Sequence, residues 1–231
     1  MRKLLLLLSC ALMSISCSND ESSKLSQSSL TLYSGDTATL TYSGSCKWRS
    51  DQPLIASVDN GVVKALLIGK TNIYANNEVC QVTVKPHYTQ YAEPYIKWGT
   101  STSAYESYMR GYGYTKVSGD NSGGLWSDDI TNTMYMYIAS NGQISATCII
   151  TSLYKTESLT KFLCERFIPL DYVDGYAYFV NIAYDTMIGE TINTDYNDEY
   201  ALWALAIPYD TRANEEEVLA KFKQIYESYM Q

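Results

Sequence analysis

The sequence predicts two domains, an all-β sandwich over residues 28–86 followed by an α+β domain over residues 87–231. Two observations predict this division. From residue 30 to residue 84, short alternating apolar runs are separated by turn residues, as in sandwiches built from many short strands. From residue 103 onward, apolar residues at helical spacing take turns with strand-like runs, which indicates a domain that mixes helices and strands.

The first 16 residues read as a removable export signal. Arg2 and Lys3 form a positive start, and the apolar run over residues 4–13 is too short to cross a bilayer, which needs about 20 residues. The following Ser14-Ile15-Ser16-Cys17 resembles the bacterial lipobox, although Ser14 replaces the usual leucine. This resemblance implies that Cys17 carries lipid and ties the chain to a membrane. The alternative is an ordinary signal peptide with a chance cysteine.

Residues 17–27 are polar and unpatterned, which predicts a flexible tether. Within this stretch Asp20-Glu21 resembles, in a short form, the surface-export signal of Bacteroidetes lipoproteins. The resemblance implies an outer-membrane, lipid-anchored protein exposed at the cell surface. Display on the inner leaflet stays open as the alternative.

Between residues 30 and 84 the pattern predicts seven short strands, over 30–33, 37–42, 46–49, 55–58, 62–65, 71–75 and 79–84. Asn60-Gly61 between two apolar runs is a strong hairpin signal. The order and spacing of several segments resemble the bacterial immunoglobulin-like domain, group 2: Gly35–Leu40, Lys47–Pro53, Ile55–Val63, Gly69–Ile73 and Cys80–Val84. The resemblance implies an immunoglobulin-like sandwich that serves as a spacer or adhesive module, with Trp48 in its core.

The second domain predicts two helix-then-sheet units and a last helix. Ser103 and Glu106 have the form of a capping box, and Tyr105, Tyr108 and Met109 share one helical face. Strands are expected over 134–139, 144–151, 176–184 and 200–208, and a second helix carries Leu159, Phe162 and Leu163. Residues 103–151 can be laid over residues 158–208, which suggests a duplication. From Asn214, a helix is expected with the apolar stripe Val218, Phe222, Ile225, Tyr226 and Tyr229.

Four cysteines remain once Cys10 leaves with the signal and Cys17 is lipidated: Cys46, Cys80, Cys148 and Cys164. An even number in an oxidising compartment permits two disulfides, with three possible pairings. Cys46 and Cys80 are both expected to point inward, as a bridge or as separate core thiols. Cys148 is expected on one strand face with Ile144, Ala146 and Ile150, and Cys164 on the second helix, as core thiols or as a helix-to-sheet disulfide.

Composition limits the chemistry. The formal net charge is −8 and no basic run is present, which argues against nucleic acid. The single histidine, His87, lies at the domain junction, so histidine metal sites and catalytic triads are not expected. We expect no metal, no cofactor and no catalytic residue. Asp128 with Asp129, Asp171 with Asp174, and the acids over 195–199 lie in expected loops and leave a carboxylate-dependent hydrolase as one alternative.

Exposed aromatic side chains are the remaining candidates. The chain has 22 tyrosines, which suit both half-buried strands and contact surfaces. Trp126 and Trp98 are the candidate binding residues, because an exposed indole stacks on a sugar ring or anchors a protein partner. A core position for Trp126 is the alternative. We therefore expect a non-enzymatic adhesion or ligand-binding lipoprotein, with a glycan-binding accessory protein of a polysaccharide-uptake system as the second interpretation.

Overall fold

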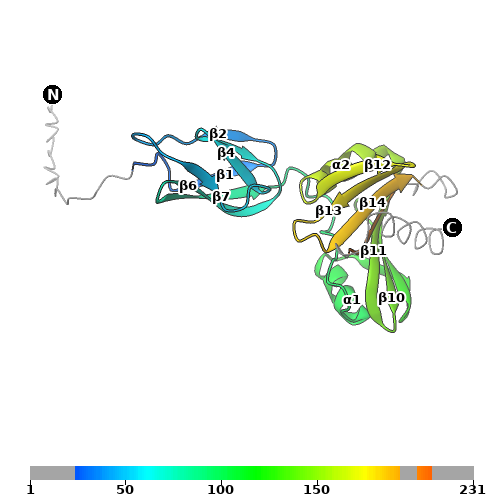
Figure 1. Cartoon of the computed structure of the whole chain (residues 1–231). Coiled ribbons are helices and arrows are strands. Elements are labelled where there is room, and N and C mark those ends of the chain that lie inside the picture. The colour runs from blue at the N-terminus through cyan, green and yellow to red at the C-terminus, as the bar shows by residue number, and fades with distance from the viewer. Residues whose placement is uncertain (1–23, 193–201, 210–231) are drawn as a thin grey trace, which may run out of the picture.

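The computed structural model describes residues 24–192 and 202–209, which are mostly β-strand with few helices. They form two units joined by a segment over residues 86–100 (Figure 1). The expected signal over 1–16, Cys17, most of the tether and the expected helix from Asn214 lie outside the described residues. Among those that are described, no helix is long and apolar enough to cross a membrane.

The first unit consists of two facing sheets in a sandwich-like arrangement. One has the strand order β1-β7-β6-β3 and the other β2-β5-β4. The strands are β1 (Ser29–Tyr33), β2 (Thr37–Thr39), β3 (Trp48–Ser50), β4 (Ala56–Asp59), β5 (Val62–Ala65), β6 (Gly69–Ala75) and β7 (Glu78–Lys85). β1 and β7 pair in parallel, whereas every other pair is antiparallel. Alternate residues of both sheets fill the core between them, among them Leu32, Val63, Ile73 and Val82.

The expected hairpin at Asn60-Gly61 is confirmed between β4 and β5. Both residues have left-handed backbone, with φ of 48° at Asn60 and 85° at Gly61, as a two-residue turn of this type requires. Gly61 is also crowded, since a Cβ atom there would lie 2.4 Å from the carbonyl oxygen of Leu40. Glycine is therefore required at position 61 by both backbone conformation and space.

The second unit contains one antiparallel sheet of eight strands in the order β12-β13-β14-β15-β11-β10-β9-β8. In chain order its elements are α1 (Thr102–Gly111), β8 (Thr115–Gly119), β9 (Gly123–Asp128), β10 (Thr133–Ser140), β11 (Gln143–Thr151), the 3-10 turn η1 (Leu153–Lys155), α2 (Thr156–Cys164), β12 (Ile168–Val173), β13 (Tyr176–Val180), β14 (Thr186–Ile192) and β15 (Leu202–Pro208). The expected helices around Tyr105 and Phe162 are confirmed.

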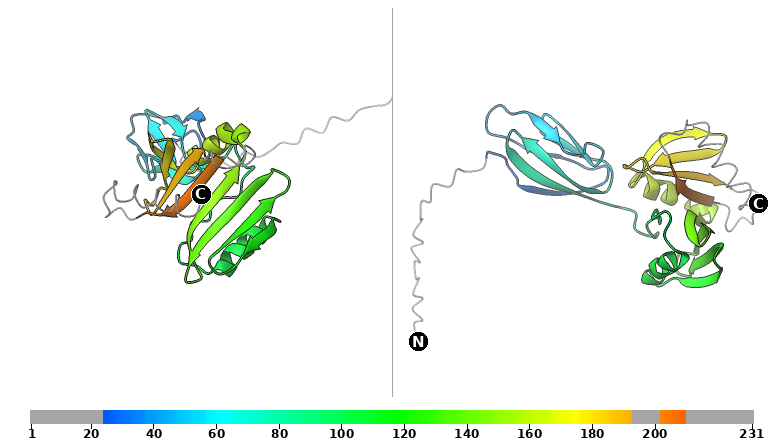
Figure 2. Two further views of the ribbon diagram at one scale, coloured as in Figure 1. Left: turned by 90° about the vertical axis from the view of Figure 1, so that its right-hand side faces the viewer. Right: turned by 60° about the horizontal axis from the view of Figure 1, so that its bottom comes forward.

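The element order repeats within this sheet. α1 is followed by four strands that pair in sequence, and α2 is followed by four more that do the same. The two groups meet where the last strand of each, β11 and β15, pair antiparallel at the centre of the sheet. Figure 2 shows this continuous sheet, with the green strands of the first group beside the yellow and orange strands of the second.

The two faces of the eight-stranded sheet carry separate apolar clusters. Both helices pack on one face, where Tyr105 and Met109 of α1 and Phe162 of α2 join side chains of the strands. The opposite face, called the second face below, carries a cluster that comes from the sheet alone: Ile138, Ala146, Cys148, Ile150, Tyr178, Met187, Trp203, Leu205 and Ile207.

Two expectations about strands are wrong. No strand is expected over residues 115–119, 123–128, 168–173 or 186–192, and Asp128 and Asp171 are expected in loops, but these ranges form β8, β9, β12 and β14. In addition, Ile144 does not share a face with Cys148. A bulge shifts the register between Ile138 and Ala139 of β10, opposite Ser145 of β11, and this extra residue turns Ile144 to the helix-covered face.

Candidate functional site

The junction between the two units is held by Glu165, directly after α2. Its side chain is buried, and its two carboxylate oxygens accept hydrogen bonds from the backbone N–H groups of His87 at 2.8 Å and Tyr88 at 3.1 Å. Its backbone carbonyl accepts a third, from the Ile68 N–H at 2.8 Å. The His87 ring stacks on Tyr33 with 4.9 Å between centroids. One residue thus bonds both the first unit and the connecting segment.

Arg166 extends this network on the other side. The Arg166 side chain is 4% exposed. Its guanidinium pairs with the Glu93 carboxylate at 2.7 Å, and it donates hydrogen bonds to the carbonyl oxygens of Tyr88 at 3.1 Å and Phe162 at 3.0 Å. It also lies 3.7 Å above the Phe162 ring. A planar guanidinium that is bonded and stacked in this way fixes the path of residues 88–93 against α2.

Beside this network, an open groove of about 310 Å³ lies between the two units. The first unit contributes Leu54, Leu66 and Leu67, and the second contributes Cys164, Ile168 and Pro169. Its lining is largely apolar, and its size falls in the range of small-molecule sites, which often lie at domain interfaces. The groove is therefore the candidate functional site.

The polar groups of the groove are few. The Ser34 hydroxyl donates to the Leu66 carbonyl oxygen at 2.5 Å and is thereby occupied. Lys64 is exposed, and no carboxylate among residues 24–192 and 202–209 pairs with its ammonium group. Although Cys164 is exposed, partial burial of its thiol, aided by the charges of Glu190 and Glu165, raises its pKa. This thiol is thus protonated at neutral pH and a poor nucleophile. The groove thus offers apolar surface with few polar groups.

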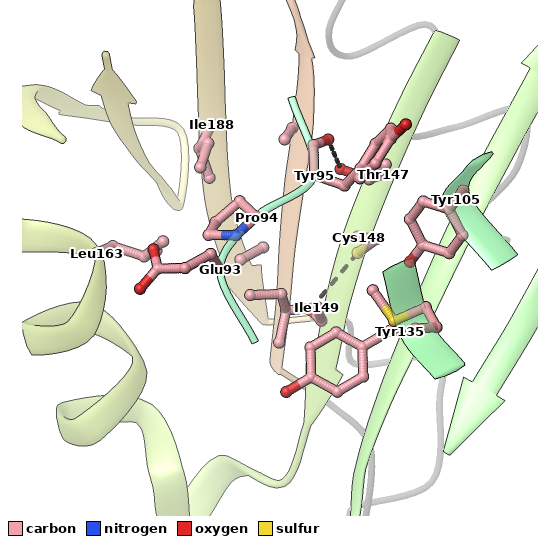
Figure 3. A pocket seen from close by; sticks show the side chains of 13 residues that line it. Glu93, Pro94, Tyr95, Tyr105, Tyr135, Thr147, Cys148, Ile149, Leu163 and Ile188 are labelled. Carbon is pink, nitrogen blue, oxygen red and sulfur yellow. Dashed lines mark hydrogen bonds between the residues drawn. The ribbon is translucent and has the colours of Figure 1, made fainter. Parts of the chain in front are cut away.

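A different space, which is small and enclosed, lies between α1, α2 and the sheet (Figure 3). Its volume is about 10 Å³, which is the lower limit for a single water molecule. Thr147 on its wall donates a hydrogen bond to the Tyr95 carbonyl oxygen at 3.1 Å, and the other walls are largely apolar or aromatic. A space of this size is a packing gap and not a ligand site.

Seven tyrosines beside that gap form a continuous row of ring contacts, with neighbouring centroids 4.9 to 5.4 Å apart: Tyr137, Tyr105, Tyr95, Tyr108, Tyr112, Tyr114 and Tyr135. Their hydroxyls bond the connecting segment. Tyr135 accepts from the Ala92 N–H at 3.0 Å, and Tyr108 donates to the Glu93 carbonyl oxygen at 2.7 Å. This group of tyrosines thus serves packing and positions the connecting segment against α1.

The two tryptophans expected to bind a ligand do not form an exposed surface. Trp126 is 1% exposed, on the helix-covered face of β9 with Arg110 5.6 Å from its ring, so its proposed surface role is wrong. The alternation of β9, which was not expected to be a strand, turns it inward. Trp98 is half-buried, and its Nε1 donates to the Thr186 hydroxyl at 3.0 Å, which leaves it a packing residue as well.

The four cysteines are free thiols, so neither of the two possible disulfides is formed, and Cys164 is exposed rather than a core thiol. Cys148 and Cys164 cannot bridge in this fold because Cys148 faces the second face, whereas α2 lies on the opposite side of the sheet. Cys46 and Cys80 both pack on the core of the first unit, as expected, without a bond.

The expected carboxylate pairs do not all lie in loops, because Asp128 ends β9 and Asp171 lies in β12, whereas Asp129 and Asp174 are in turns. Asp128 is buried and accepts hydrogen bonds from the Ile130 N–H and the Thr131 hydroxyl, which makes it a turn-stabilising residue. Asp174 has φ of 52° in the β12–β13 hairpin. The acids over 195–199 lie outside the described residues. Within the described part of the chain, no group of three metal-ligating side chains is brought together.

Comparison with known proteins finds no matching family model, no matching curated protein and no matching solved structure. Functional inference therefore depends on the chain's own residues. Sequence reasoning did not find the groove, because its residues come from the β1–β2 turn, the segment before β4, the end of β5 and the residues after it, the end of α2 and the start of β12, which are far apart in the chain. Only the unexplained apolar run Ala65-Leu66-Leu67-Ile68 gave a signal for it.

Proposed function

We propose that the chain is a non-enzymatic, ligand-binding lipoprotein of the bacterial outer membrane, tethered through lipid on Cys17 and displayed at the surface. The observation that carries the binding function is the apolar groove between the two units, with Leu54 and Leu67 on one wall and Ile168 and Pro169 on the other. The lipobox-like Ser14–Cys17 and the acidic Asp20-Glu21 support the address.

The ligand class follows from the lining. Leucine, isoleucine and proline side chains favour an apolar body, because its burial removes hydrocarbon from water. Lys64 at the rim, without a carboxylate partner among the described residues, favours an acidic group at one end of the ligand. We therefore propose an amphipathic organic anion as the ligand.

The anionic dye anilinonaphthalene sulfonate, which has this chemistry, tests the proposal in a soluble Cys17→Ser chain. We expect saturable binding at one site, at least tenfold weaker in Leu54→Asp and threefold or more weaker in Lys64→Gln. Val62→Asp is the matched control, because Val62 is 47% exposed on the same unit and lies outside the groove. Fluorescence titration measures each Kd. Absence of saturable binding, or equal weakening in the control, would contradict the groove as the binding site.

A polar hollow on the first unit favours a second candidate, the binding of a glycan. The hollow measures about 300 Å³, and its lining includes Asp51, Asn72, Gln81 and Thr83. Carboxylate, amide and hydroxyl groups are the partners that sugar hydroxyls need. A glycan array probed with the soluble chain tests this function. Loss of a positive signal in Gln81→Ala, with retention in Leu54→Asp, would assign the glycan to the hollow.

We further propose that the first unit is an immunoglobulin-like domain of group 2, and that the second is an α+β domain that arose by duplication. The facing sheets and the inward Trp48 support the first proposal. The repeated order of one helix and four strands supports the second. Superposition of residues 102–151 on residues 156–208 in an experimental structure would test the duplication.

A further inference from the structure

The second face of the sheet is a deeply buried apolar surface. Its nine residues are each at most 6% exposed, from Ile207 at 0% to Ile138 at 6%. All nine come from β10, β11, β13, β14 and β15, and the buried residues of α1 and α2 belong to the other face. One layer of side chains cannot exclude water from itself, so a second layer must cover this face.

The last described residue of the chain lies at this face. β15 is a central strand that ends at Pro208, and the next residue, Tyr209, packs against the second-face cluster. The sequence continues for residues 210–231. The four residues 210–213 reach about 13 Å when extended, which is enough to step across the roughly 10 Å between packed layers.

The sequence of this last segment fits such a layer. Its apolar stripe recurs at three- and four-residue spacing, from Val218 through Phe222 and Ile225 to Tyr229, and the charged residues Lys221, Lys223 and Glu227 fall outside it. As a helix, residues 214–231 would extend about 27 Å. The five strands that carry the second face span about 19 Å at the usual strand spacing.

We propose that residues 214–231 form an amphipathic helix whose stripe docks on the second face and gives the sheet a helical layer on both sides. Docking would shield both the apolar stripe and the second face from water, which stabilises both. A helix of this length is only marginally stable in isolation, so it depends on such packing. The occupant is the chain's own end rather than a second copy, because the connection from Tyr209 is short and already at the face.

Cys148 reports on the covering layer, because its thiol lies within the second face and is 2% exposed. In a soluble chain with Cys17, Cys46 and Cys164 replaced by serine, we measure maleimide labelling of Cys148 by mass spectrometry. Ile225→Asp, in the stripe, should raise the labelling rate at least tenfold. Gln224→Asp is the matched control, since it adds the same charge outside the stripe, and its rate should change less than twofold.

A second measurement guards against simple misfolding of the Ile225 variant. A protease site placed within residues 210–213 allows the segment to be cut from the folded chain. We expect the cut segment to co-elute with the body and Cys148 to become reactive only when the segment is removed by dilution. Unchanged protection after its removal would overturn the proposal. So would a dimer mass whose dissociation, rather than loss of the segment, exposes Cys148, since a second copy would then be the cover.

Discussion

At the scale of single residues, Glu190 of β14 is a buried carboxyl group with a perturbed pKa. The side chain is 5% exposed, and the Thr160 hydroxyl of α2 lies 2.8 and 2.9 Å from its two oxygens. Burial raises the pKa of this carboxyl to about 7. Below that pH the folded chain therefore holds a proton that the unfolded chain releases near pH 4.5, the ordinary value.

This difference predicts a stability that falls as the pH rises. Between about pH 4.5 and pH 7 the folded state binds more protons than the unfolded state, so the free energy of unfolding decreases with pH and levels off above 7. The total loss is on the order of 3 kcal/mol for a shift of this size. Glu190→Gln should remove this pH-dependent loss of stability. The variant should be more stable than the parent protein at pH 8 and about equally stable at pH 4.

Urea unfolding at pH 4.5, 6 and 8 measures this prediction. Glu157→Gln is the matched control, since Glu157 lies on α2 as well but is exposed and pairs with Lys161. The control should keep the decline of the parent protein. If both variants showed the same pH dependence, Glu190 would not be the group responsible.

At the scale of elements, the tight turns were the most predictable features. Asn60-Gly61 and Asn141-Gly142 both have left-handed backbone at each residue, which few residue types tolerate, so these dipeptides determine their hairpins locally. The faces of strands were less predictable. The bulge opposite Ser145 arises from pairing between β10 and β11, and no local signal gives it, so the face of Ile144 was misassigned.

Strands β8 and β9 were missed for a related reason. Gly123 and Gly124 weaken the strand pattern, yet glycine is needed at 124 because a Cβ atom there would lie 2.5 Å from the Tyr137 ring. Without β9 as a strand, the inward direction of Trp126 could not be deduced. The groove was missed because it depends on the packing of the two units, which strand and helix periodicity do not specify.

The β4–β5 turn gives a prediction with an internal control. Gly61 and Gly35 have similar φ of 85° and 89°, but a Cβ atom at position 35 would meet nothing within 4 Å. In Gly35→Ala the free energy of unfolding should therefore fall only by the cost of left-handed backbone in alanine, about 1–2 kcal/mol. In Gly61→Ala the free energy of unfolding should fall by about 1–3 kcal/mol more, because the added Cβ atom would lie too close to the Leu40 carbonyl oxygen. Thermal unfolding of both variants checks the difference, and equal losses would contradict the crowding argument.

At the scale of the whole molecule, Glu165 and Arg166 determine how the two units are joined. Glu165→Ala removes the acceptors of the His87 and Tyr88 amides and one partner of Arg166. Each freed amide costs about 1–3 kcal/mol if it stays buried, so we expect the connecting segment to detach and the units to move apart.

Small-angle X-ray scattering measures this change as a larger radius of gyration in Glu165→Ala. Glu157→Ala serves as the control, because it removes an exposed carboxylate from the same helix and should leave the scattering unchanged. Dye binding in the groove should weaken in parallel, because its walls come from both units. An unchanged radius would show that the junction does not depend on Glu165.

The central pairing of β11 with β15 also bears on how the chain folds. Strands within each group of four pair with neighbours in the sequence, whereas Thr151 meets Leu202 across about fifty residues. Local pairings form fast and distant ones slowly, because a long loop must first be closed. Until residues 202–208 have been synthesised, the backbone edge of β11 has no strand to pair with. A nascent chain paused before residue 202 would thus expose an apolar, hydrogen-bonding edge, the kind of surface that chaperones protect from aggregation.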